Sequence, residues 1–277
     1  MNLNNIFHEI NKVDPEVYER FDGRRAAMKN FARFSGKIAL SAVPIVFGSM
    51  FKKAYAGTTG TLETAVEILN YALTLEYLES EFYTMALAQA PIPAGAARGA
   101  IETISKHETA HVAFLTTAIK AASGTPVAKP TFDFTAGGAF GNVFTNYATF
   151  LAVAQTFEDT GVRAYKGRAA ELVKGGDLLT AALNIHSVEA RHAAHIRSMR
   201  KANGFGDAKP WITGKDTSGI GAAVQKSYDG EENTIQATIQ ITNINNQSIS
   251  ASAASEAFDE GLTKDQVLAI VKPFIKA

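Results

Sequence analysis

Two pairs of side chains have the spacing of metal ligands. Glu108 precedes His111 by three residues, and Glu189 precedes His192 by the same interval. Residues three apart on a helix share a face, so a carboxylate oxygen and an imidazole nitrogen can converge on one ion. One Glu-x-x-His is common by chance, and a second in the same chain makes a metal centre the leading hypothesis.

Each pair is preceded by a second repeated motif. Glu76 is followed seven residues later by Tyr83, and Glu158 is followed seven residues later by Tyr165. The lone glutamate precedes its Glu-x-x-His by 32 residues in the first half and by 31 in the second. Two such repeats at nearly equal distance indicate four helices that present one carboxylate each.

The first of these glutamates lies in an apolar stripe. Seven helical steps return to within about 20° of the starting direction, so Glu76 and Tyr83 share a face, which Leu69, Leu73 and Leu87 also occupy. A buried carboxylate is unfavourable unless it is paired, hydrogen-bonded or bound to a cation. All four glutamates fall near the middle of their predicted helices, and two divalent ions would neutralise them.

Composition narrows the chemistry further. The chain has 277 residues, no cysteine, 27 basic and 27 acidic side chains, and 46% hydrophobic residues. The absence of cysteine excludes disulfides, thiolate ligands and cysteine nucleophiles, and the zero net charge argues against a nucleic-acid partner held by bulk positive charge. A metal must therefore be held by carboxylate, imidazole or water.

Helical periodicity, Gly/Pro turns and one long non-helical passage (123–141) predict an all-α antiparallel four-helix bundle with one long crossover. A helix of about 28 residues is roughly 42 Å long, and the passage of about 19 residues can span it. We expect the helices at residues 61–91, 96–122, 142–173 and 177–202.

The motifs resemble those of the ferritin-like di-metal carboxylate superfamily, over about residues 59–203. The amino-acid sequences of these motifs, LEYLESEFY at 75–83 and VEARH at 188–192, are similar to those of the exported ferritin-like branch that includes desiccation-related proteins. The resemblance implies two divalent ions, Fe or alternatively Mn, and oxidation of Fe(II) by O2 or peroxide; the alternative is a non-catalytic metal-binding or stress-protective bundle. The implied ligands are Glu76, Glu108, His111, Glu158, Glu189 and His192, with Glu108 and Glu158 as the bridging or mobile carboxylates.

Alternatives remain for several neighbouring side chains. Glu79 is close enough to the inward face to replace Glu76, but the equivalent position of the repeat is Gly161, which argues against it. We expect Tyr83 and Tyr165 to hydrogen-bond ligand carboxylates. Asp159 lies off the ligand face. His107, His186 and His195 are expected behind the ligands or at the surface. In a metal-free alternative, the glutamates and histidines pair with each other or with Arg163 and Arg191.

The first 56 residues have the pattern of an export signal. Arg24 and Arg25 precede an uncharged run at 38–51, and a small-x-small motif ends at Ala56. The run of 14 residues is too short to span a bilayer as a helix, so no stable membrane span is expected after signal removal. The paired arginines are similar to a twin-arginine signal, although the Phe expected two residues later is missing. We expect a periplasmic or extracellular protein.

The predicted domains are therefore the signal (1–56), the bundle (57–203) and a C-terminal arm (204–277). Within the arm, residues 235–241 alternate between apolar and polar types, which predicts a strand, and 251–258 and 263–275 favour two short helices. We expect the arm to cover the bundle or to form a contact between copies in a homo-oligomer.

Overall fold

The computed structural model describes residues 62–244 and 246–276. The predicted signal, with its apolar run at 38–51, lies outside these residues, as does Thr61, the expected first residue of the first helix. Across the part that is described, no helix is both long and apolar enough to cross a membrane.

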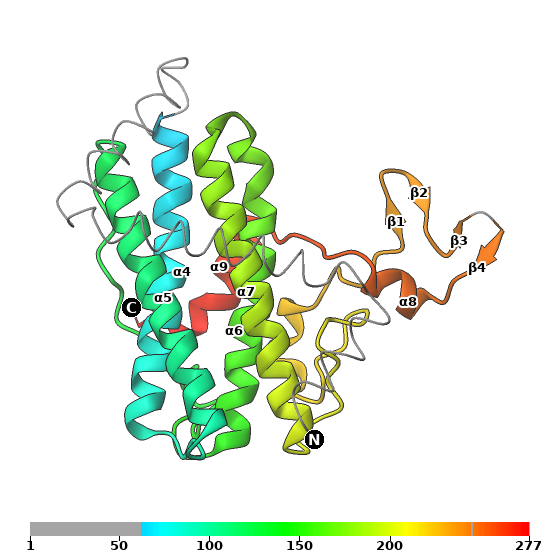
Figure 1. The fold of residues 1–277 in the computed structure, drawn as a ribbon, viewed down its shortest axis with the longest axis horizontal. Coiled ribbons are helices and arrows are strands. Elements are labelled where there is room, and N and C mark those ends of the chain that lie inside the picture. The colour runs from blue at the N-terminus through cyan, green and yellow to red at the C-terminus, as the bar shows by residue number, and fades with distance from the viewer. Residues whose placement is uncertain (1–61, 245, 277) are drawn as a thin grey trace, which may run out of the picture. The chain divides into compact units, whose positions relative to one another are not determined.

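Four long helices form the bundle that the sequence predicts. Helices α4 (Leu62–Gln89) and α5 (Ala96–Ala121) pack along each other, as do α6 (Tyr147–Ala169) and α7 (Asp177–Ala202). Contacts of α4 with α6 and of α5 with α7 close the bundle (Figure 1). The all-α fold is confirmed, and the inward faces of four helices meet along one axis.

The third helix is shorter than predicted. It begins at Tyr147, because the Asn146 side chain accepts a hydrogen bond from the Thr149 backbone N–H and caps the helix there. Residues 134–145 form consecutive turns in which Phe140 and Val143 are buried. At its other end α6 tightens into a 3-10 helix, η1 (Ala170–Gly175). The crossover therefore extends from 122 to 146.

An aromatic cluster fixes this crossover to the bundle. The buried ring of Phe82 on α4 lies 5.3 Å from Phe134 of the crossover, 5.3 Å from Phe150 and 5.0 Å from Phe157 on α6, centroid to centroid. Aromatic pairs at such distances add to the stabilisation from burial alone. The cluster lies beside Tyr83 and so borders the predicted metal centre.

The residues after the bundle cover α6. They include η2 (Ala222–Ser227), α8 (Ala251–Glu256), α9 (Lys264–Val271) and η3 (Lys272–Phe274), and both α9 and η2 contact α6 (Figure 1). Every residue of α6 from 153 to 165 is buried as a result. Arg163 is central to this contact, because its guanidinium donates to the carbonyls of Ser227, Asp229 and Glu260.

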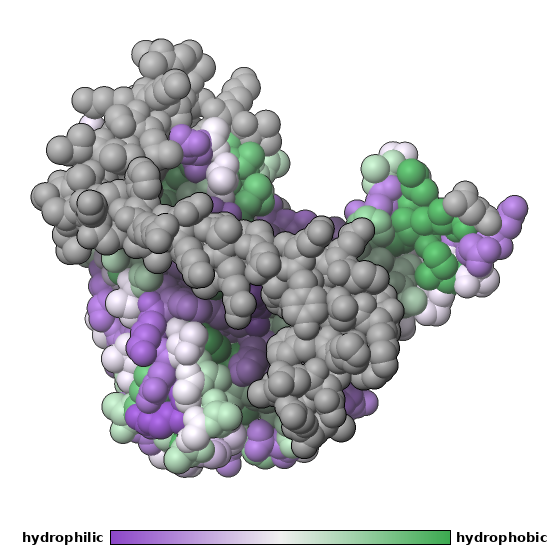
Figure 2. Space-filling model, viewed as in Figure 1, coloured by the Kyte–Doolittle hydropathy of each residue, from purple (hydrophilic) through white to green (hydrophobic). Residues whose placement is uncertain are grey.

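The strand predicted at 235–241 is instead a small hairpin. Strands β1 (Ile235–Gln236) and β2 (Ile239–Gln240) pair antiparallel, and Ala237 and Thr238 between them both have positive φ, as a two-residue hairpin turn requires. A second hairpin joins β3 (Asn243–Ile244) to β4 (Gln247–Ser248). Ile235 and Ile239 are exposed, and Figure 2 shows hydrophobic surface in this region.

A close glycine contact holds the C-terminal segment on α6. A Cβ added to Gly167 would lie 1.8 Å from the carbonyl oxygen of Leu262. The backbone N–H of Leu262 donates a hydrogen bond to the carbonyl of Arg163 on α6. We expect Gly167→Ala to lower the free energy of unfolding by about 1–3 kcal/mol, because the two backbones must separate. Chemical denaturation measures the change.

The matched control is Gly99→Ala on α5, where an added Cβ meets no atom within 4 Å. It is expected to stabilise by about 0.5–1 kcal/mol, the gain of alanine over glycine inside a helix. Equal effects of the two substitutions would show that the contact with Leu262 contributes nothing to stability.

Candidate metal centre

Each long helix supplies one carboxylate at mid-height in the bundle. Glu76 lies on α4, Glu108 on α5, Glu158 on α6 and Glu189 on α7, and all four have no solvent exposure. Their ion pairs within the described residues are with histidines alone. The four helices thus bring their glutamates together in one buried acidic cluster, as expected.

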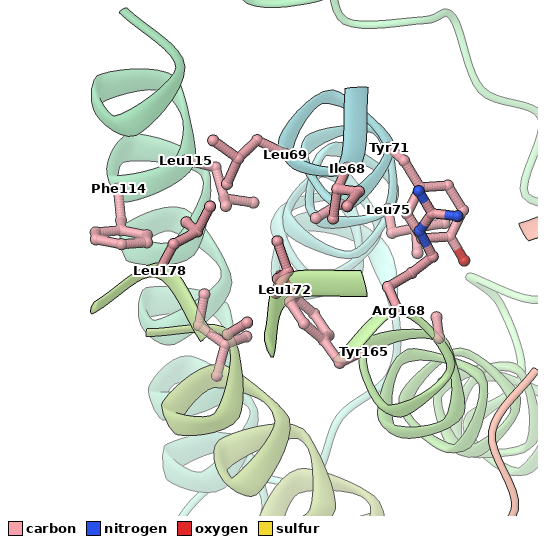
Figure 3. A pocket seen from close by; sticks show the side chains of 14 residues that line it. Ile68, Leu69, Tyr71, Leu75, Phe114, Leu115, Tyr165, Arg168, Leu172 and Leu178 are labelled. Carbon is pink, nitrogen blue, oxygen red and sulfur yellow. The ribbon is translucent and has the colours of Figure 1, made fainter. Parts of the chain in front are cut away.

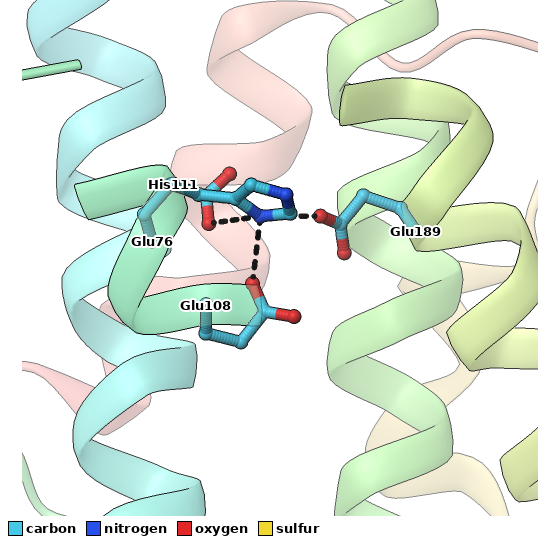
Figure 4. A group of neighbouring side chains, drawn as sticks. All are labelled: Glu76, Glu108, His111 and Glu189. Carbon is cyan, nitrogen blue, oxygen red and sulfur yellow. Dashed lines mark hydrogen bonds and ion pairs between the residues drawn. The ribbon is translucent and has the colours of Figure 1, made fainter. Parts of the chain in front are cut away.

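His111 is at the centre of the first group of donor atoms. Its Nδ1 lies 3.2 Å from Glu76 Oε2, 3.2 Å from Glu108 Oε2 and 3.2 Å from Glu189 Oε1 (Figure 4). A ring nitrogen carries at most one hydrogen and cannot satisfy three carboxylate oxygens. The arrangement therefore has more acceptors than hydrogen bonding can use.

His192 is at the centre of a second group. Its Nδ1 lies 2.9 Å from Glu108 Oε1, 3.2 Å from Glu158 Oε2 and 3.8 Å from Glu189 Oε2. The nitrogen, Glu108 Oε1, Glu158 Oε2 and both oxygens of Glu189 are buried without a hydrogen bond of proper geometry. Buried polar atoms without partners are rare in folded proteins and point to a bound ion or water.

Two carboxylates belong to both groups. Glu108 and Glu189 each direct one oxygen toward His111 and the other toward His192. In each group the four donor atoms lie within 4.8 Å of one another. The geometry favours Glu108 and Glu189 as the shared carboxylates, whereas the sequence had suggested Glu108 and Glu158; Glu158 belongs to the second group alone.

The donor set fits a pair of hard divalent ions. Each group offers three carboxylate oxygens and one imidazole nitrogen, a set that suits Fe or Mn and contains no soft ligand. The six residues expected from the sequence are thus brought together by four helices.

The two tyrosines hydrogen-bond carboxylates across the bundle. Tyr83 on α4 donates to Glu158 on α6, and Tyr165 on α6 donates to Glu76 on α4. Each tyrosine therefore orients a glutamate that belongs to one group of donor atoms only. Contacts of this kind fix the direction of ligands in metal sites.

One neighbouring histidine contacts a ligand. His107 Nδ1 lies 3.0 Å from His192 Nε2, and the two rings are stacked. This contact engages the outer nitrogen of His192 and leaves Nδ1 facing the carboxylates. His186 instead donates from Nδ1 to the carbonyl of Val162, and His195 is exposed.

Arginine does not neutralise the cluster. Arg163 forms its ion pair with Glu231, at 2.8 Å, and Arg191 is exposed. Asp159 is buried, and its carboxylate binds Arg197 at 2.6 Å and accepts a hydrogen bond from Tyr228. These contacts fasten the C-terminal segment to α6 and α7. Among the described residues, the glutamates of the cluster therefore pair with His111 and His192, as the metal-free alternative also allowed, and not with Arg163 or Arg191.

A fifth carboxylate, that of Glu79, is buried next to the cluster, although it does not replace Glu76 in the first group. This side chain is 3% exposed on the inner side of α4, one turn after Glu76, and belongs to neither group of donor atoms. Burial raises its pKa well above the usual value, and the charges of Glu189 and Glu158 raise it further. The signal in the sequence was its position three residues after Glu76, next to the inward face.

Burial and mutual contacts shift the pKa values of the clustered glutamates and histidines. Burial raises the pKa of Glu108 to about 7 and that of Glu158 to about 8. Burial opposes the charged form of His111 and His192, yet hydrogen bonds and charges from the glutamates raise both pKa values to about 12. Hydrogen bonds from the same histidines outweigh burial at Glu189 and lower its pKa to about 2.

A small apolar cavity reaches Tyr165, which hydrogen-bonds Glu76. It has a volume of about 20 Å³, close to the size of one water molecule, and Tyr165 forms part of its wall (Figure 3). The other lining side chains are almost all hydrophobic, with Arg168 the charged exception. The space beside Tyr165 can therefore hold only a very small molecule.

Comparison with known families agrees with this geometry. A family model described as "Ferritin-like domain" matches residues 64–202, which is 139 of the 277 residues and includes all six candidate ligands. The chain belongs to this ferritin-like family. No curated protein matches the chain.

The raised pKa values predict how pH changes the stability of the protein when a chelator keeps metal ions away. Glu108, Glu158 and both histidines hold protons in the folded chain at pH values where the unfolded chain has lost them. Stability therefore falls as pH rises from 5 to 8, by roughly 1.4 kcal/mol per pH unit for each proton released on unfolding. Glu189 has the opposite sign, and its contribution is lost only at low pH.

Thermal unfolding of the chelated protein at pH 5, 6, 7 and 8 measures this slope. Glu158→Gln is the control, because it removes one titrating group and reduces the slope. Added divalent ions displace the protons and so oppose the decline. A melting temperature that rises from pH 5 to pH 8 in the chelated protein contradicts the protonation assigned to the cluster.

Proposed function

We propose that this ferritin-like domain binds two divalent ions of iron or manganese. Glu76, Glu108, His111 and Glu189 hold one ion, and Glu108, Glu158, Glu189 and His192 hold the other. The observation that carries the proposal is that Glu108 and Glu189 each direct their two oxygens to the two histidine-centred groups. Such shared carboxylates suit a pair of ions a short distance apart.

We further propose that the centre oxidises Fe(II) with O2 or peroxide. Bound in this site, a pair of ions would supply the electron-transfer chemistry. The protein keeps the ligands away from bulk water, since the four glutamates have no exposure, and Tyr83 and Tyr165 orient Glu158 and Glu76. The apolar cavity beside Tyr165 supports entry of a small uncharged oxidant.

We also propose that the protein is exported from the cytoplasm. Residues 1–56 combine paired arginines, a short apolar run and a cleavage motif, which support delivery to the periplasm or the cell exterior. The N-terminal sequence of the protein from its producing cells, beginning at Gly57, tests this part.

The metal content of the purified protein tests the proposed centre. Purified protein should contain about two transition-metal ions per chain by elemental analysis, and Glu108→Ala/Glu189→Ala should lose nearly all of them, because both groups depend on these two side chains. Glu67→Ala/Glu102→Ala, which changes two acids outside the cluster, is the matched control. Full metal content in the first variant refutes the proposed centre.

The rate of Fe(II) oxidation distinguishes a protein that oxidises iron from one that only binds it. Fe(II) added in air to the wild-type protein should produce the near-ultraviolet absorption of bound Fe(III) faster than in a protein-free solution. Glu108→Ala/Glu189→Ala should give only the background rate. Two bound ions without this absorption would favour the alternative, a metal-binding or protective bundle that does not turn over.

A further inference from the structure

A fifth carboxylate reaches the edge of the cluster. Glu79 is buried on α4, and its side chain forms no hydrogen bond or ion pair with any other described residue. It faces Gly161 on α6: a Cβ added to Gly161 would lie 3.2 Å from Glu79 Oε1 and 3.6 Å from Glu189 Oε2. The glycine therefore leaves open the space between the fifth carboxylate and a candidate ligand.

The internal repeat explains why a glycine stands there. Glu76 and Tyr83 correspond to Glu158 and Tyr165, and by the same spacing Glu79 corresponds to Gly161. The two equivalent positions face each other across the bundle, so a second glutamate would crowd the first. With glycine on one side, there is room for a single extra carboxylate.

We propose that Glu79 is an additional metal ligand, which reaches the ion of the Glu158–His192 group by rotation of its side chain into the space beside Gly161. This inference rests on the proposed di-metal centre. The position of Glu79 fits that ion, because a Cβ added to Gly161 would lie close to both Glu79 Oε1 and Glu189 Oε2, and Glu189 Oε2 is the oxygen directed toward His192.

The negative charge of Glu79 would balance a trivalent ion in the centre. Four ionised glutamates and two neutral imidazoles balance two divalent ions, whereas a trivalent ion in one position leaves an excess positive charge. Glu79 supplies the missing negative charge without a change in the other ligands. It should therefore strengthen the binding of a trivalent ion more than that of a divalent ion.

The test compares Glu79→Gln with wild type in equilibrium titrations with Co2+ and with Tb3+, followed by calorimetry and, for Co2+, by visible absorption. Glutamine keeps the size of the side chain and removes its charge. We expect the affinity of one of the two Co2+ ions to fall roughly 10-fold and that of Tb3+ roughly 100-fold or more. The second Co2+ ion should bind as in wild type.

Two further variants complete the experiment. Gly161→Ala fills the space and should weaken the same single ion, and Glu67→Gln, an exposed acid on the same helix, should change neither titration. The inference is overturned if Glu79→Gln binds Co2+ and Tb3+ with wild-type affinity. It is also overturned if the variant loses affinity equally for the two Co2+ ions. If wild type itself binds no ion, the proposed di-metal function fails instead, so the two failures are distinguishable.

Discussion

The structure depends on keeping four carboxylates away from water at one level of the bundle. Taking an ionised carboxylate into a protein interior costs several kcal/mol even after relaxation, and four together also repel one another. His111 and His192 offset part of this cost through their Nδ1 atoms, each of which lies near three carboxylate oxygens. Two cations in the same positions would offset it more completely, which is the physical basis for assigning the cluster to metal binding.

This constraint explains why the C-terminal segment packs on α6. Helix α6 carries Glu158, Gly161 and Tyr165 on its inner side, and the C-terminal segment covers its outer side. The cover is attached by apolar and polar contacts: Phe274 packs on Phe157, Arg163 binds Glu231, and Tyr228 donates to Asp159. Removing one partner of a buried ion pair commonly costs 3–5 kcal/mol, so these contacts make α6 a rigid support for the ligands.

The sequence predicted which side chains come together better than it predicted the helix ends. Spacings of three and seven residues are set by helix geometry, and they located Glu108 and His111 without knowledge of the tertiary structure. The start of α6 at Tyr147 was missed, because it depends on the Asn146 cap and on burial of the crossover turns. The hairpin at 235–240 was missed because alternation alone does not distinguish one strand from two short strands joined at Ala237 and Thr238.

Glu79 and Gly161 show how two similar halves of a bundle can differ at equivalent positions. Equivalent positions in two halves were expected to have equivalent roles, so Gly161 argued against Glu79. In a bundle with two similar halves, however, equivalent positions can face each other across the axis, and close packing then requires them to be complementary and not alike. Gly161 is small because Glu79 is large, and the pairing makes the two halves of the centre unequal. A centre with unequal halves can hold two ions of different charge, which a symmetric set of four carboxylates does not favour.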